Sequence, residues 1–236
     1  MTKILKFIQL NMSRYKPEQH NIHRRRILQY SLGLSIGGLA GGACSQDKKT
    51  DSLWTPRQTE GPFYPVQPQQ DKDVDLTIIE GHSEHAKGEI IHVRGRVLDT
   101  HGNTVNNAFV EIWQANTWGR YRHPRDPNNA PLDPNFQGWG QTYTDTQGNY
   151  GFKTIMPGAY PAGPGWTRPP HIHFKAAKEN YYPLTTQMYF PKHELNDTDA
   201  ILQNLSEVEQ RMVISKLQPG TENEKLFIFD IVLRRA

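Results

Sequence analysis

Cysteine is nearly absent from this chain, since Cys44 is the only one among 236 residues. A single cysteine excludes an intrachain disulfide, even in an oxidising compartment. Long apolar runs are also missing, because the run at residues 30–43 is short and rich in glycine for a membrane span. These absences leave a globular domain that depends on its own hydrophobic core, and residues 59–236 are numerous enough to form one.

Positive charge is concentrated at the N-terminus. The whole chain carries a formal net charge of +3, but residues 1–44 contain seven Lys or Arg and one acidic residue, whereas the remainder contains 20 basic and 23 acidic residues. Residues 45–236 are therefore slightly acidic and show no basic stripe. Nucleic acid is not expected as a partner, because domains that bind it concentrate positive charge on one face.

The first 44 residues resemble a twin-arginine export signal. Three consecutive arginines at residues 24–26 precede the apolar run, and Cys44 closes that run in a position similar to a lipoprotein cleavage site. Gly41 departs from such sites, which prefer leucine there. We expect export to the bacterial periplasm, followed either by lipidation at Cys44, which would anchor the protein to the membrane, or by plain cleavage nearby. An uncleaved N-terminal anchor is the alternative.

The rest of the chain has the pattern of an all-β sandwich. Residues 45–58 are polar and predict a linker before a single domain at residues 59–236. Runs rich in apolar, β-branched and aromatic residues alternate there with clusters of Gly, Asn, Asp and Pro, which is typical of antiparallel or mixed strands joined by turns. The predicted strands are Ile90–Leu98, Ala108–Trp113, Tyr150–Ile155, His171–Lys175, Thr185–Phe190 and Leu226–Leu233.

One helix and one long loop interrupt this pattern. Residues 198–213 predict a single helix with Asp197 or Thr198 as its N-cap. The apolar positions at helical spacing are Ile201, Leu205, Val208 and Met212. Residues 125–140 are rich in proline and asparagine and predict a long loop, which is expected to border a binding site because long irregular loops often do.

The pattern His171-Ile172-His173 lies on a predicted strand and suits a metal ion. Side chains two residues apart on a strand point to the same face and lie about 6 to 7 Å apart, so two imidazoles can reach one ion. The same pattern occurs where two histidines face solvent. The pair alone therefore leaves a metal site and a polar surface as alternatives.

Tyr121 and Tyr160 would change the preferred metal if they joined the two histidines. A phenol has an ordinary pKa of about 10 and must lose its proton to bind a metal, which is unfavourable at neutral pH unless the cation is strongly Lewis-acidic. Ferric iron meets that demand, whereas zinc is usually held by Cys, His and carboxylate. Taken singly, Tyr121 also fits a loop aromatic and Tyr160 fits turn packing.

Five motifs follow one another along residues 55–235. They are Thr59-Glu60-Gly61-Pro62-Phe63-Tyr64, then Gly95-Arg96-Val97 with Val110-Glu111-Ile112-Trp113-Gln114-Ala115-Asn116, then Gly119-Arg120-Tyr121-Arg122-His123, Pro157-Gly158-Ala159-Tyr160-Pro161 and Arg168-Pro169-Pro170-His171-Ile172-His173-Phe174. In this order they resemble the motifs of intradiol ring-cleavage dioxygenases, and most of all the iron-bearing (beta) subunits of protocatechuate 3,4-dioxygenases. Several motifs in register are far more specific than any one of them.

The resemblance implies a non-haem Fe(III) centre. Its ligands would be Tyr121, Tyr160, His171 and His173, with water or hydroxide at the remaining position. Ferric iron, two phenolates and one hydroxide sum to zero charge, so burial would strand no net charge. In the family a catechol-type diol binds as a dianion and reacts with O₂ to give a cis,cis-muconate that keeps both oxygen atoms. The tyrosine matching Tyr160 leaves the metal and acts as a base.

Further site residues follow from the same resemblance. Arg168 matches an arginine that stabilises carbanion character on the ring, and a loop salt bridge is its structural alternative. Gln187 matches a glutamine that forms hydrogen bonds near the ligand histidines, or it is an ordinary strand residue. Tyr64 is expected to contact substrate at the pocket entrance, with packing as its alternative. The expected catalytic residues are therefore Tyr160, Arg168 and Gln187.

Two departures from the family bear on the substrate. Ala162 stands where protocatechuate enzymes commonly have a tryptophan, and the Gly/Pro-rich segment 162–166 differs in length. We expect Trp166 to supply the missing aromatic contact from another backbone position. The chain has no room for the large helical dimerisation segment of catechol 1,2-dioxygenases, which favours protocatechuate or a related diol. A homo-oligomer and a complex with a homologous partner subunit both remain open.

Two other classes of protein compete with this reading. A catalytically silent, transthyretin-like binding module would keep the β-sandwich and lose the metal. A zinc hydrolase built on His171 and His173 would need a carboxylate or cysteine as its third ligand, and Glu111 is the nearest candidate by motif. Pairing of Glu111 with Arg96 or Arg120 is the structural alternative.

Overall fold

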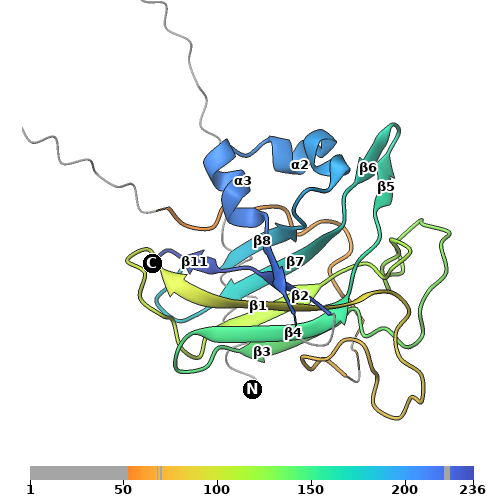
Figure 1. The fold of residues 1–236 in the computed structure, drawn as a ribbon, viewed down its shortest axis with the longest axis horizontal. Helices are drawn as coiled ribbons and strands as arrows, with labels where there is room; N and C mark the ends of the chain where they lie inside the picture. Colours follow the sequence, from red (N-terminus) through yellow and green to blue (C-terminus); the bar gives the residue numbers. More distant parts are fainter. Residues whose placement is uncertain (1–52, 68, 70, 221–223) are drawn as a thin grey trace, which may run out of the picture. The chain divides into compact units, whose positions relative to one another are not determined.

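Strands dominate the architecture, as the alternation of apolar runs and turn residues predicts. The computed structural model describes residues 53–67, 69, 71–220 and 224–236 (Figure 1). The strands are β1 (Ile90–Asp99), β2 (Phe109–Trp113), β3 (Trp139–Tyr143), β4 (Asn149–Ile155), β5 (Tyr160–Gly163), β6 (Trp166–Arg168), β7 (His171–Ala177), β8 (Leu184–Tyr189), β9 (Lys216–Pro219), β10 (Lys225–Ile228) and β11 (Ile231–Leu233).

Two sheets share one core, which confirms the all-β sandwich. The larger sheet has the order β11-β1-β10-β9, with β4 also paired to β1, and the smaller sheet has the order β3-β2-β7-β8. Apolar side chains of both sheets meet in one buried cluster that includes Val93 and Phe152 from the larger sheet and Ile112, Phe174 and Met188 from the smaller one. Burial of such side chains, at about 25 cal/mol per Å² of apolar surface, is the main force that joins the sheets.

Three strands of the four-stranded sheet, β2, β7 and β8, are buried on both faces, and this determines where a site can form. Every residue of β2 and β8 is buried, and only the last residue of β7 is partly exposed. Because side chains alternate along a strand, Ile172 and Phe174 of β7 enter the core while His171, His173 and Lys175 share the opposite face. That second face is covered by loops and by the helical residues 200–213, whose Leu202 and Val213 pack on Tyr189 of β8, not by another large sheet.

The single helix predicted over residues 198–213 is wrong. The structure has a 3₁₀ turn, η1 (Glu194–Thr198), and two short helices, α2 (Ala200–Gln203) and α3 (Glu207–Val213). Asp199 begins α2 by accepting a hydrogen bond from the Leu202 backbone, and Ser206 begins α3 through a capping box with Glu209. Each cap needs an extended backbone at its own position, so a continuous helix cannot pass through both.

The predicted strand at residues 226–233 is also divided, and Gly95 explains the division. β10 and β11 both run parallel to β1. They pair with β1 before and after Gly95, where the backbone of Phe229 crosses β1. A Cβ atom built on Gly95 would lie 1.8 Å from the carbonyl oxygen of Phe229. The chain can therefore cross here only because Gly95 has no side chain. Strands β3, β5, β6 and β9 were not predicted.

Replacing Gly95 by alanine is expected to destabilise the fold by about 3 kcal/mol, because the added methyl group must displace the Phe229 backbone. Thermal unfolding should show a decrease in Tm of about 10 °C for a domain of this size. Gly163→Ala is the matched control, since no atom lies within 4 Å of its added Cβ. Equal melting temperatures for the two variants would show that the crossing is not tight.

The predictions for the N-terminus lie outside the described residues. The export signal at residues 1–44, Cys44 and most of the linker at residues 45–58 precede Leu53, where the description begins. From Leu53 onward, none of the described helices has the length and apolar character that a bilayer-crossing helix requires.

Candidate metal centre

His171 and His173 lie side by side on β7, as their spacing predicts. Their ring centroids are 4.9 Å apart, and both side chains are buried. The register of the sheet pairs His173 with Trp113 of β2 and with Gln187 of β8, so these three residues point to the same face. Because the neighbouring strands are themselves fixed by the core, the two imidazoles are held on a rigid support.

Each imidazole is held in place by a different contact. Nδ1 of His171 lies 2.7 Å from the Pro169 carbonyl oxygen and donates its proton there, which leaves the lone pair of Nε2 facing the Tyr121 hydroxyl at 3.4 Å. The ring of His173 instead stacks on Trp113, with centroids 4.7 Å apart and planes at 10°. Nδ1 of His173 is buried and has no hydrogen-bond partner within the described residues. A polar atom in that state is typical of a site that holds a further group.

Tyr121 and Tyr160 come from separate segments and meet the histidines. The two phenol rings are 5.5 Å apart and nearly perpendicular. Tyr160 lies 5.6 Å from His171 and Tyr121 lies 6.1 Å from His173, measured between ring centroids. Tyr121 is oriented by its backbone N–H, which donates to Asp126 at 2.7 Å. The structure thus brings all four side chains named from the sequence around one point.

The protonation states fit a strongly Lewis-acidic cation. Burial, followed by the charge of Arg168, keeps the pKa of His171 and of His173 well below its ordinary value, so both rings are neutral and can donate lone pairs. Burial raises the pKa of Tyr121 well above its ordinary value and also raises that of Tyr160. Two buried phenols can become phenolates only beside a high positive charge. The donor set therefore suits a trivalent metal ion.

A covering loop at residues 59–64 closes one side of the centre. Phe63 packs 5.0 Å from Tyr121 and 6.2 Å from Tyr160, between ring centroids. Lys175, on the same face of β7 as the histidines, contacts Glu60 at 2.6 Å and lies 3.2 Å from the centroid of the Tyr64 ring. These contacts fix the loop to the sheet and place Phe63 against the aromatic side of the site.

The Tyr64 hydroxyl donates to Glu111 at 3.1 Å. Glu111 also accepts from the indole of Trp139 and the amide of Gln141, each at 2.7 Å. Its partners are therefore these three groups, not Arg96 or Arg120. Throughout the described segments no three His, Cys, Asp or Glu side chains form a metal-binding group. The zinc alternative thus has no third ligand of the expected kind there.

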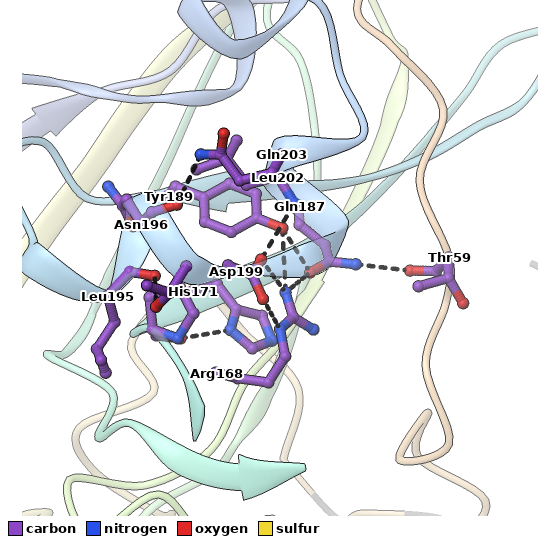
Figure 2. Close-up of polar contacts among 12 residues, drawn as sticks. Thr59, Arg168, His171, Gln187, Tyr189, Leu195, Asn196, Asp199, Leu202 and Gln203 are labelled. Carbon is purple, nitrogen blue, oxygen red and sulfur yellow. Dashed lines mark hydrogen bonds and ion pairs between the residues drawn. The ribbon is translucent and has the colours of Figure 1, made fainter. Parts of the chain in front are cut away.

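Arg168, at the end of β6, is buried in a polar network beside the histidines (Figure 2). Its guanidinium donates to Gln187 at 2.8 Å, to the Tyr189 hydroxyl at 3.0 Å and to Asp199 at 2.8 Å. The amide nitrogen of Gln187 donates to the Thr59 carbonyl at 3.0 Å. Gln187 therefore links Arg168 to the covering loop, and Arg168 lies in a buried ion pair, which was its structural alternative.

Two members of this network were missed from the sequence. Tyr189 stood in a predicted strand without a role, and Asp199 lay one or two residues beyond the expected N-cap. The signal for Asp199 was present, since a carboxylate before an apolar helical turn caps that helix. Its ionic partner could not be found in that way, because Arg168 is 31 residues away.

Trp166 lies beside Arg168 on the β5-β6 ribbon. The segment 162–166 forms the turn of this ribbon, with Gly165 at a φ of +70°, which glycine adopts readily. The Arg168 guanidinium is 5.7 Å from the centroid of the Trp166 ring. An aromatic side chain therefore stands next to the buried cation, although Ala162 itself provides none.

Comparison with known proteins gives concordant matches. A family described as "Dioxygenase" matches residues 59–235. The protocatechuate 3,4-dioxygenase beta chain of Burkholderia cepacia is 44% identical over 184 residues, which are 75% of this chain and 78% of that protein. The catechol 1,2-dioxygenase of Candida albicans is 33% identical over 122 residues, which are 46% of this chain but only 39% of that protein.

Solved structures that resemble this chain are also dioxygenases. The dioxygenase domain of a carbohydrate-binding fusion protein from Streptomyces sp. SirexAA-E superposes with a TM-score of 0.59 and 27% identity, covering 78% of this chain and all of that domain. The 3-chlorocatechol 1,2-dioxygenase of Rhodococcus opacus 1CP superposes with a TM-score of 0.61 and 22% identity, covering 78% of this chain and 74% of that one. The match to the Rhodococcus opacus enzyme shows a similarity of fold alone.

Proposed function

Because this chain belongs to the intradiol ring-cleavage dioxygenases, an enzyme family that uses non-haem iron, we propose that it holds Fe(III) and cleaves protocatechuate or a related catechol-type diol with O₂. The product would be a cis,cis-muconate. The bond between the two hydroxyl-bearing carbons breaks, and both atoms of O₂ enter the product. The diol supplies the electrons, so no external reductant is needed.

The observation that carries this proposal is the convergence of two phenols and two imidazoles in one buried place. Tyr121, Tyr160, His171 and His173 would hold the ion. When bound, ferric iron would supply the Lewis acidity that makes a chelated catecholate reactive towards O₂. The alternative binding module would have no reason to bury these four groups together, since burial of polar groups without partners is unfavourable.

Tyr160 is proposed as the base that takes a proton from the diol. Burial raises its pKa and the nearby charge of Arg168 offsets this only in part, so a phenolate formed there beside a ferric ion would be a strong base. Arg168 is proposed to stabilise negative charge that develops on the ring, because it is a fixed cation in a site of low dielectric. Gln187 would hold Arg168 in position through the hydrogen bond to its guanidinium.

Protocatechuate is favoured over plain catechol by the extent of the similarity. The protocatechuate relative matches over most of both chains, whereas this chain spans less than half of the length of the Candida albicans catechol 1,2-dioxygenase. The Burkholderia cepacia relative is named a beta chain, which supports a homologous partner subunit for this protein. A homo-oligomer is the other arrangement. Light scattering of the purified protein, alone and with a candidate partner, distinguishes the two.

Trp166→Ala is expected to change the ratio of kcat/KM for protocatechuate and catechol by about tenfold, since an aromatic wall beside Arg168 would be lost. The ratio should be measured with equal iron content. Trp54→Ala is the control, because Trp54 is exposed and stacks on Arg234. If Trp166→Ala left the ratio and the apparent affinities unchanged, Trp166 would have no part in substrate selection.

Product analysis under ¹⁸O₂ tests the proposed reaction. Iron-loaded protein mixed with protocatechuate should give a ring-opened tricarboxylic acid whose two new carboxyl groups together carry two heavy oxygen atoms, with the cut between the hydroxyl-bearing carbons. One heavy atom, or a cut outside the diol, would indicate a different reaction. Binding without ring opening would favour the transthyretin-like module.

We also propose that the domain is exported to the periplasm. The three arginines and the apolar run before Cys44 support this proposal. Export of a folded domain would allow the metal to enter in the cytoplasm. Mass spectrometry of the mature N-terminus shows whether the signal is cleaved and whether Cys44 carries a lipid.

A further inference from the structure

Asp199 forms a two-point ion pair with Arg168 inside the protein. The distances are 2.8 Å from Nε to Oδ1 and 3.2 Å from Nη2 to Oδ2, and Asp199 is fully buried. Paired contacts of this kind fix the plane of a guanidinium as well as its position. Asp199 is itself held in place, because the same carboxylate accepts a hydrogen bond from the Leu202 backbone at the start of α2.

The network engages only one side of the guanidinium. Nη2 donates to Gln187 and to the Tyr189 hydroxyl in addition to Asp199, and Nε donates to Asp199. None of the hydrogen bonds formed within the described residues uses Nη1. Both protons of Nη1 are therefore left for a ligand, and Figure 2 shows Arg168 held by Gln187, Tyr189 and Asp199.

A long arginine side chain would otherwise sample several rotamers, and a displaced guanidinium stabilises charge less well. From the ion pair, its burial and the free edge of the guanidinium, we propose that Asp199 is a positioning residue for the reaction and acts only through Arg168. The proposal rests on the proposed function, because it assigns a role within that reaction. It extends the site to the turn between η1 and α2, whose sequence carries no metal ligand.

The first test is Asp199→Asn, which removes the charge and keeps the shape and an oxygen that can cap α2. Iron content and the affinity for protocatechuate, titrated without oxygen, should stay within about threefold, while kcat should fall by about 10 to 100-fold. Asp197→Asn is the matched control, because Asp197 is exposed and lies on the same turn. A merely structural role would lower affinity and iron content together with kcat.

The second test is a double-mutant cycle with Arg168→Met. If Asp199 acts only through Arg168, adding Asp199→Asn to Arg168→Met should leave kcat unchanged. In metal-free protein, Arg168→Met should lower Tm because it strands a buried carboxylate, and adding Asp199→Asn should restore part of that loss. If Arg168→Met does not fold, Arg168→Lys takes its place, and the effect of Asp199→Asn should be smaller in that background than in the wild type.

Two results would overturn the proposal. One is an Asp199→Asn enzyme with the kcat of the wild type, and the other is an equal loss of kcat in the presence and in the absence of Arg168. Failure of the proposed function is distinguishable from both, because the iron-loaded wild-type protein itself would then turn over no diol. In that case Asp199 would have no positioning role in a reaction, and only the effect of its ion pair with Arg168 on Tm would remain.

Discussion

Replacing His173 by alanine should decrease the affinity for iron by more than about 100-fold, because one of four protein ligands is removed and the ring cannot be replaced by a neighbour. The ring stacks on Trp113 and faces away from the core. The variant should therefore fold, with a modest decrease in Tm from the lost stacking. Iron should be quantified after reconstitution, and far-UV circular dichroism should report on the fold.

His85→Ala is the control for this experiment, because His85 is exposed and forms no hydrogen bond or ion pair within the described residues. It should keep the iron of the wild-type protein. Tyr121→Phe should lose iron like His173→Ala, since it removes only the oxygen of a second ligand. Full iron and full activity in His173→Ala or Tyr121→Phe would contradict the assignment of ligands.

Replacing Tyr160 by phenylalanine should decrease kcat/KM for the diol by about 100 to 10,000-fold, the range for loss of a general base. The phenyl ring can keep the packing against Tyr121 and His171, at centroid distances of 5.5 and 5.6 Å. Loss of the oxygen removes both a ligand and the group that takes the proton. The kinetic constants should be corrected for iron content.

Tyr143→Phe provides the matched control, because it removes the hydroxyl of an exposed tyrosine on β3. Its kinetics should equal those of the wild type. If Tyr160→Phe kept its kcat/KM after correction for iron, the proton would have to leave the diol by another route, and Tyr160 would be packing alone.

The sequence predicted the half of the site that depends on local geometry. His171 and His173 share a face because they are two residues apart on a strand, and alternation alone determines that. The sandwich was predictable for the same reason, since apolar runs and turn residues define strands. Both predictions use only the period of the strand and the chemistry of neighbouring residues.

The other half depends on contacts between distant segments. Tyr121 and Tyr160 were linked to the histidines only through the resemblance to a family, because nothing in their own neighbourhoods requires a metal. The ion pair of Arg168 with Asp199 and the three hydrogen bonds to Glu111 join segments that meet only after folding. Pattern and propensity contain no information about such partners.

The helical segment shows how local signals can compete. Apolar spacing over residues 198–213 favoured one helix, but Asp199 and Ser206 each begin a new one. The residues that become buried are Leu202 and Val213, and Val208 is 39% exposed. Caps determined the outcome here because short helices gain little from propensity and depend on satisfied ends.

A visible spectrum recorded without oxygen tests the proposed iron centre and its substrate together. Iron-quantified protein should be coloured by charge transfer from phenolate to Fe(III), the band should shift when protocatechuate or catechol is added, and admission of O₂ should restore the first spectrum as ring-opened product accumulates. A folded protein that stays colourless after reconstitution with iron, or a spectrum that no diol changes, would contradict a ferric centre held by Tyr121, Tyr160, His171 and His173.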